Sequence, residues 1–231
     1  PTDGINFLSA GFGEEVYHRL WKENGAGVEM VRGEHPEQIG GFIYNPEVLK
    51  RVYDRLAEDA DIDFLFNTSL VDVMVEDGTI THAVCSAKSG LFAVSAKVFI
   101  DATGDGDLCA MAGAEYEKGD ENGRMQAGTL CSLWSGIDWS RMKIWHDGAR
   151  MPEAIRENIF SVPDISLPGI LHTVSDSGWG NVGHVFGADG TDEQSVTLAV
   201  LDARRRIPEY ETYYRRFVPG AENAVMLWTA A

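Results

Sequence analysis

A nucleotide could be held by residues 100–108, which read IDATGDGDL. An apolar stretch ends there in small residues, and an apolar helix is expected to follow. Ala102, Thr103 and Gly104 leave room for a ligand or another backbone to approach closely. Asp105 and Asp107 would repel phosphate, but they can accept hydrogen bonds from ribose hydroxyls, and either is a natural N-cap. The alternative is a capped strand-to-helix turn that binds nothing.

A second glycine-containing segment, residues 178–183, matches the pattern G-x-G-x-x-G as GWGNVG. In a dinucleotide-binding domain this motif leaves a strand and opens a helix, whose N-terminus meets the pyrophosphate. Residues 184–190 read HVFGADG and lack helical periodicity. We therefore predict a glycine-rich turn between strands, and no dinucleotide fingerprint.

The same turn carries the candidates for contact with a substrate. Trp179 offers an aromatic face, Asn181 an amide, and His184 an imidazole that exchanges protons near neutral pH. The alternative is a surface turn with a packed tryptophan. The three arginines at 204–206 are predicted to lie on a solvated helix face, with a clamp for a substrate carboxylate as the alternative.

No spacing of Ser, His and Asp, or of paired carboxylates, indicates a catalytic set, so the catalytic residues are not assigned. Cys85, Cys109 and Cys131 are widely spaced and belong to no Cys/His cluster, so no metal site is predicted. Unpatterned thiols of this kind favour a reducing compartment, and we expect a cytoplasmic protein.

The net charge excludes several classes of partner. The 231 residues include 19 Lys and Arg against 36 Asp and Glu, which gives a formal charge of −17. Such an acidic chain lacks the basic surface that binds nucleic acid or an anionic membrane. No apolar run reaches the roughly 20 residues that span a bilayer. With 44% hydrophobic and 24% charged residues, the composition is that of a globular protein.

Helical spacing of apolar residues predicts helices over 14–21, 46–59, 141–160 and 192–217. Asn45 is a good N-cap for the second helix, and Pro46 fits its first position. Thr191 or Asp192 can cap the last helix. The buried side of that helix is predicted to hold Leu198, Leu201, Ile207 and Tyr210.

Strand signals fill the regions between these helices. Residues 70–94, with the turn Asp77-Gly78, predict an antiparallel meander of three strands. Residues 64–66 suggest a short buried strand, and residues 97–102 a strand buried on both faces. Further strands are expected within residues 129–134 and 170–187.

These segments carry a resemblance to a known family. Residues 45–50 (NPEVLK), the meander, and residues 98–114 (VFIDATGDGDLCAMAGA) resemble the FAD-dependent oxidoreductases of the glutathione-reductase-like superfamily. The resemblance is greatest to the bacterial subgroup with the IDATGDGD signature. Residues 187–192 (GADGTD) and 218–224 (VPGAENA) resemble later segments of that family, so the resemblance covers nearly the whole chain.

The resemblance implies a mixed α/β fold in two domains. Residues 1–115 would form a partial FAD/NAD(P)-binding, Rossmann-like domain that contains the antiparallel three-stranded meander. Residues 116–231 would form a substrate-side α+β domain. The implied cofactor is FAD, and the implied reaction moves hydride or electrons between a small-molecule substrate and the flavin.

The resemblance also implies roles for particular residues. The backbone of Val71, on the strand that enters the meander, would lie by the adenine. Ala102, Thr103 and Gly104 would pass beside the adenosine and its ribose, and Asp107 would lie near the same end. The principal contacts of the isoalloxazine would lie outside this chain.

Two segments of the family have no counterpart in the sequence. The family begins with a strand and a G-x-G-x-x-G helix that hold the FAD pyrophosphate, and it ends with a segment that contacts the flavin. We therefore expect an internal fragment, completed by missing segments or by a partner chain, that alone neither binds FAD tightly nor turns over. The alternative function is a cofactor-free binding or scaffolding module that complements a partner chain.

Overall fold

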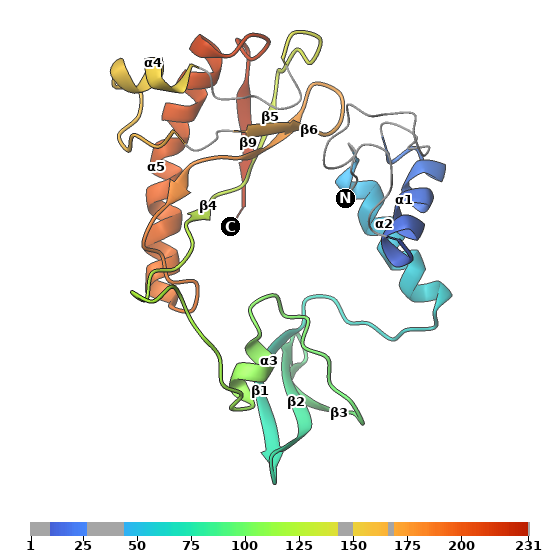
Figure 1. Ribbon diagram of the computed structural model, residues 1–231. Coiled ribbons are helices and arrows are strands. Elements are labelled where there is room, and N and C mark those ends of the chain that lie inside the picture. Colours follow the sequence, from blue (N-terminus) through green and yellow to red (C-terminus); the bar gives the residue numbers. More distant parts are fainter. Residues whose placement is uncertain (1–9, 27–43, 143–149, 166–168, 231) are drawn as a thin grey trace. The chain divides into compact units, whose positions relative to one another are not determined.

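The computed structural model describes residues 10–26, 44–142, 150–165 and 169–230 (Figure 1). Residues 57–119 form one compact unit, and the other described residues belong to a second. Helices and antiparallel strands occur in both, so the mixed α/β fold class is confirmed. The predicted division at residue 115, with a nucleotide side and a substrate side, stays a prediction.

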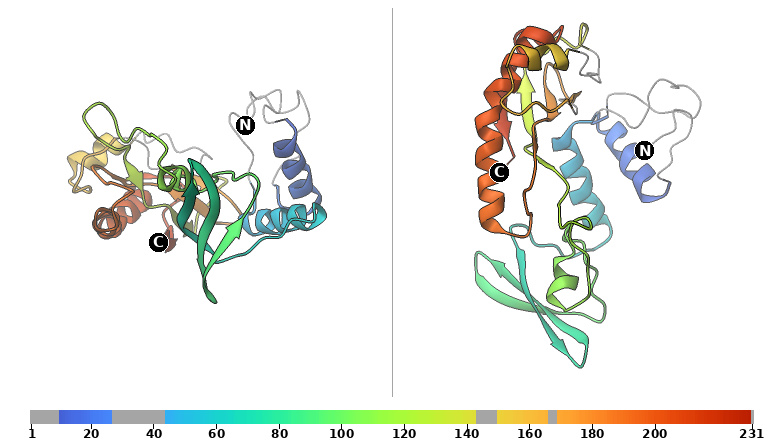
Figure 2. Two further views of the ribbon diagram at one scale, coloured as in Figure 1. Left: turned by 90° about the horizontal axis from the view of Figure 1, so that it is seen from below. Right: turned by 60° about the vertical axis from the view of Figure 1, so that its left-hand side comes forward.

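Two amphipathic helices near the start of the described chain pack against each other (Figure 2). They are α1 (Phe12–Lys22) and α2 (Pro46–Asp59), and they confirm the first two predicted helices. Asn45 caps α2 as predicted, because its Oδ1 accepts the N–H of Glu47 at 2.9 Å. Tyr17, Leu20 and Val52 are buried between the two helices.

The unit of residues 57–119 is built on the predicted meander. Its antiparallel strands, paired in the order β1-β2-β3, are β1 (Ser69–Glu76), β2 (Thr79–Ala87) and β3 (Gly90–Ser95). Asp77 and Gly78 have φ of 48° and 74°, as a tight hairpin turn requires. The short helix α3 (Asp107–Met111) packs on β1.

Two strand predictions in this unit are wrong. Residues 64–66 form no strand, and Leu65 and Phe66 are 68% and 71% exposed. Residues 97–102 form no strand either, and Val98 and Ile100 are exposed. A strand buried on both faces needs hydrogen-bonded neighbours at both edges, and no described strand pairs with either segment. Apolar composition alone therefore misled the prediction.

Two small sheets form the framework of residues 120–230. One sheet has the order β6-β7-β5-β9, and the other pairs β4 with β8. Their strands are β4 (Gly128–Thr129), β5 (Ser132–Ser135), β6 (Gly169–His172), β7 (Gly178–Asn181), β8 (His184–Val185) and β9 (Val225–Thr229). All pairs are antiparallel, and the first five strands lie where strands were predicted.

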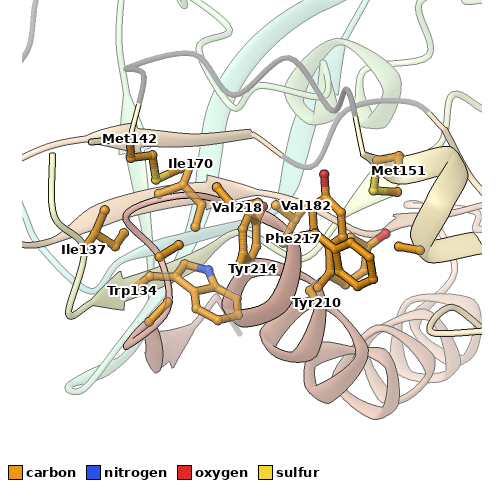
Figure 3. Close-up of a cluster of buried hydrophobic side chains, with 14 of the residues drawn as sticks. Trp134, Ile137, Met142, Met151, Ile170, Val182, Tyr210, Tyr214, Phe217 and Val218 are labelled. Atoms are coloured by element: carbon orange, nitrogen blue, oxygen red, sulfur yellow. The ribbon is translucent and has the colours of Figure 1, made fainter. Parts of the chain in front are cut away.

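Helix α5 (Glu193–Phe217) provides the aromatic side of the main core (Figure 3). Asp192 caps it as predicted, by accepting the N–H of Ser195 at 2.6 Å. The buried residues of this core, drawn from α5, the sheet and the connecting loops, include Trp134, Met151, Ile170, Val182, Ile207, Tyr210, Tyr213, Tyr214 and Phe217.

The predicted buried side of α5 is only half correct. Ile207 and Tyr210 are buried, but Leu198 and Leu201 are 67% and 43% exposed. The first turns of α5 present Ala199 and Ala203 to a small cluster with Leu130 and Val185, so the leucines face outward. Small residues permit the close approach of helix and strand, which the hydrophobic pattern alone does not reveal.

The predicted helix over residues 141–160 is much shorter where the structure describes it. Helix α4 spans Met151–Arg156, and residues 143–149 lie outside the described residues. Asn158 has a φ of 57°, and the N–H of Ile159 reaches the carbonyl of Ala154 at 3.0 Å. This left-handed termination ends the helix before residue 160. None of the helices described is long and apolar enough to cross a membrane.

Candidate functional site

Asp101 organises the turn that was predicted to approach a nucleotide. Its Oδ1 accepts the N–H of Thr103 at 3.1 Å and the Thr103 hydroxyl at 2.8 Å. Its Oδ2 accepts the N–H of Cys109 at 2.9 Å, and Thr103 Oγ1 accepts the N–H of Asp107 at 2.9 Å. These bonds fix the loop while Ala102, Thr103 and Gly104 remain exposed.

The same hydrogen bonds keep Asp101 ionised. The N–H of Cys109, followed by the N–H and hydroxyl of Thr103, lowers the pKa of Asp101 to about 2. In turn, its hydrogen bond to the Cys109 side chain raises the pKa of that thiol. Asp101 is therefore an anion at neutral pH. Both of its carboxylate oxygens accept hydrogen bonds from Thr103 and Cys109, so its role is to hold the conformation of the loop.

Two glycines in this turn have positive φ and are surrounded by open space. Gly104 and Gly106 have φ of 98° and 77°, which favours glycine, and a Cβ at either would meet nothing within 4 Å. The prediction of Asp105 or Asp107 as N-cap is wrong, because Gly106 occupies that position. The Thr103 hydroxyl instead accepts the first helical N–H.

Val71 lies at an irregularity of the β1–β2 ladder. Leu70 pairs with Cys85 and Asp72 with Val84, so Val71 is an extra residue with no partner in β2. Such a bulge takes the N–H and C=O of a residue out of the regular ladder. The Val71 side chain is 42% exposed. Val71 belongs to the same compact unit as residues 102–107.

Two glycines in residues 178–183 allow neighbouring side chains to pack closely against the backbone of the strand. A Cβ at Gly178 would lie 2.6 Å from Ile170 Cγ2, and one at Gly180 would lie 2.7 Å from Trp134 Nε1. Gly183, with a φ of 78°, turns the chain from β7 into β8, and no helix follows. The prediction that this segment connects two strands is confirmed. Trp179 and Asn181 lie in strand β7 itself, so their placement in a turn was wrong.

Trp179 belongs to an apolar row across the four-stranded sheet. Leu171, Trp179, Leu133 and Trp228 are consecutive partners in the pairing of β6, β7, β5 and β9. Directly paired residues point to the same face, and this face is opposite to the one that carries Gly180 and the core. Trp228 is 49% exposed and meets Trp179 edge to face at 5.4 Å between ring centroids.

Asn181 and His184 meet through Thr129. The Thr129 hydroxyl lies 2.5 Å from Asn181 Oδ1, and Thr129 is the direct partner of His184 in the β4–β8 pair. Nδ1 of His184 lies 2.6 Å from Asp164 Oδ2. Two of the three substrate candidates are thus joined in one polar cluster, beside the strand that carries the third.

Arg206 is buried, so the prediction that it lies on a solvated helix face is wrong. Arg204 and Arg205 are exposed as predicted, but only 8% of the Arg206 side chain is exposed. Its Nη1 donates to the carbonyl of His184 at 2.8 Å, and its Nη2 pairs with Asp202. Arg206 therefore ties α5 to β8.

Sequence reasoning missed Thr129, Asp164 and Asp202. The Asp202–Arg206 pair has the i, i+4 spacing of helical ion pairs, so the sequence contained a signal for it. Asp164 lies 20 residues from His184, in a loop, and no local pattern joins them. Within the described ranges, no group of three or more His, Cys, Asp or Glu side chains could hold a metal ion.

Comparison with known proteins gives the family. The model of the family described as FAD dependent oxidoreductase matches residues 2–231. The chain therefore belongs to the FAD-dependent oxidoreductases. A search of curated proteins finds no match.

Proposed function

We propose that this member of the FAD-dependent oxidoreductase family supplies the adenosine contact and the substrate side of a flavoenzyme. The enzyme would move hydride or electrons between a small-molecule substrate and FAD. The family match over residues 2–231 carries this proposal. The finer assignments rest on the geometry of the two candidate regions.

The residues of the 57–119 unit suit the adenosine end of FAD. The bulge at Val71 frees backbone groups that can bond an adenine edge. Gly104 has open space where a Cβ would stand, and Thr103 holds the loop in place. Asp107 is exposed at the same turn and can accept from a ribose hydroxyl. We assign Val71, Ala102, Thr103, Gly104 and Asp107 to this contact.

The pyrophosphate has no comparable site in the described chain. In this type of fold it needs a glycine-rich loop that opens a helix. Of the described segments, residues 178–183 have the glycine pattern, and they lead from strand to strand. Asp105 and Asp107 place negative charge beside the other turn. We therefore propose that these residues alone hold FAD weakly and that the chain alone has no turnover.

Trp179, Asn181 and His184 are the residues we assign to the substrate side. Trp179 offers an aromatic ring on the open face of the sheet, and Asn181 and His184 add polar groups through the Thr129 cluster. When bound, the flavin would supply the two-electron chemistry. The residues of this chain would orient the substrate against the sheet and accept its hydrogen bonds.

The open face of the four-stranded sheet favours a second candidate function. An exposed apolar row that includes Trp228 is also suited to contact with another polypeptide. On this alternative the chain is a cofactor-free binding or scaffolding module that complements a partner chain. We place either form in the cytoplasm, since Cys85, Cys109 and Cys131 are free thiols.

Titration of the purified chain with FAD separates these functions. We expect a saturable but dialysable complex with FAD. AMP should displace FAD from it. FMN, which lacks the adenosine half, should not displace FAD. Displacement by FMN alone would contradict the adenosine assignment. A tight yellow complex that survives dialysis would contradict the proposed weak binding, and no interaction with FAD or AMP would favour the scaffolding module.

A further inference from the structure

Charged side chains are buried around one short strand, β8, which is only two residues long. The Asp164 and Arg206 side chains are 10% and 8% exposed, and both bond His184. Asp164 holds its imidazole, while Arg206 holds its backbone carbonyl at 2.8 Å. Arg206 Nε is buried without a partner in the part of the chain that the structure describes.

Such an arrangement opposes folding unless the charges are well paired. Burying a carboxylate or a guanidinium removes hydration that hydrogen bonds must replace. An apolar side chain at either position could anchor a two-residue strand without this desolvation penalty. What the charges add is a fixed position and orientation for the imidazole of His184, because each restrains a different part of that residue.

The contact with Asp164 also determines which ring nitrogen is free. A carboxylate only accepts hydrogen bonds, so Nδ1 of His184 carries the hydrogen and donates it. In the neutral ring, Nε2 then has a lone pair. No described residue bonds Nε2, and 28% of the His184 side chain is exposed. The nitrogen that can accept a proton is therefore available to a ligand.

The other charged and titratable groups around His184 are fixed in their roles. Arg206 is directed to the His184 carbonyl and to Asp202. Tyr210 packs against the turn at Gly183, and burial, followed by the charge of Asp164, raises the pKa of its phenol to about 12. Tyr210 therefore stays neutral near neutral pH, and the ring nitrogen Nε2 of His184 is the acceptor that a ligand can reach.

We propose that His184 is the proton acceptor of the substrate site and that Asp164 is its positioning residue. A hydroxyl or amine of the substrate transfers its proton to Nε2, and the electron pair of the broken O–H or N–H bond stays on the oxygen or nitrogen. The Asp164 carboxylate stabilises the resulting imidazolium. This inference rests on the proposed function, since it takes this region as the substrate side.

The neighbourhood of the pair indicates the class of substrate. Thr129 and Asn181 offer polar atoms beside the imidazole, and Trp179 lies on the same strand as Asn181, two residues away on the same face. A flat, largely apolar molecule that carries an ionisable hydroxyl or amine fits these groups. The apolar body would lie on the tryptophan, with the polar group toward His184.

Two measurements on the full chain test the pair without a known substrate. Nitrogen-15 NMR of the imidazole identifies its tautomer, and diethyl pyrocarbonate, which acylates a bare ring nitrogen, measures the availability of Nε2. We expect a single Nδ1–H tautomer at His184 and faster acylation there than at His172. The Nε2 of His172 lies 3.0 Å from the carbonyl of Ser175, and its ring stacks on Trp139, so it is the internal reference.

Asp164→Ala should convert His184 to a mixture of tautomers and slow its acylation roughly fivefold or more, because no carboxylate then fixes the proton on Nδ1. Glu209→Ala is the matched control, since Glu209 bonds the N–H of Ser161 in the same loop. It should leave both readouts unchanged, and His184→Gln should identify the signals.

An Nε2–H tautomer in the unaltered chain, or a His184 that reacts no faster than His172, would overturn the proposal even if Asp164→Ala fails to fold. Equal effects of Asp164→Ala and Glu209→Ala would also overturn it. FAD titration of the same proteins keeps the two proposals apart. Failure of the chain to bind FAD would contradict the proposed function and leave the tautomer result standing.

Discussion

The region of residues 120–230 and the unit of residues 57–119 differ in how many apolar side chains they bury. The first has a core in which Trp134, Ile170 and Tyr214 are inaccessible to solvent. In the second, the buried apolar residues are Val73 and Leu108, and Ile100 is 84% exposed. A unit this small gains little from its own apolar burial.

Their hydrogen bonds differ in the same way. The 57–119 unit is held by hairpins and by Asp101, whose partners lie within eight residues. In the other region, β5 pairs with β9, which lies about ninety residues further along the chain. Local bonds keep the shape of the first unit although much of its apolar surface remains exposed. The second region holds its shape through its core.

Truncation of isoleucine to alanine should affect the stability of the two regions to very different extents. Ile170→Ala removes a fully buried side chain and should lower the free energy of unfolding by about 2–5 kcal/mol. Ile100→Ala removes an exposed one and should change it by no more than about 0.5 kcal/mol. Urea unfolding followed by circular dichroism measures both. Similar losses for the two variants would show that the regions do not differ as described.

The glycine packing of β7 gives the next largest effect. Gly180→Ala places a methyl group against Trp134 and Ser132 and should destabilise the chain by roughly 1–3 kcal/mol. Gly190→Ala is the control, since a Cβ there meets nothing within 4 Å. Thermal unfolding of both variants tests this, and an unaffected Gly180→Ala protein would argue against close packing of β7 on the core.

The cap of α5 should contribute less. Asp192→Ala removes the acceptor for the N–H of Ser195 and should cost about 1 kcal/mol. Asp192→Asn retains an acceptor and should cost less. Urea midpoints of the two variants provide the measurement, and equal losses would indicate that charge matters here more than the hydrogen bond.

The smallest effect is local and depends on pH. Since folding lowers the pKa of Asp101 from 3.8 to about 2, its contribution is complete above about pH 5 and is lost progressively as the pH falls through 2. The protection of the Cys109 amide against hydrogen exchange, relative to its intrinsic exchange rate at each pH, should therefore fall over that interval. In Asp101→Asn this dependence should vanish. Protection that stays constant down to pH 2 in the unaltered chain would contradict the role of Asp101.

The sequence predicted local features well, because local physics determines them. Asn45, Asp192 and the turn at Asp77 were identified from caps and turn residues alone. Burial was harder to predict, since Ile100 and Leu198 are apolar but are 84% and 67% exposed among the described residues. Within the candidate site, the pairing of His184 with Asp164 depends on tertiary structure, and no spacing in the sequence encodes it.

We propose that the 57–119 unit carries the adenosine contact of a flavoprotein. Amide spectra of the nitrogen-15-labelled chain, recorded during titration with FAD, test it most directly. We predict shifts at Val71, Thr103 and Gly104 that Gly104→Val abolishes. Gly123→Val should preserve them, because Gly123 also has a positive φ and open surroundings. Shifts confined to residues outside 57–119, or equal loss in both variants, would contradict the claim.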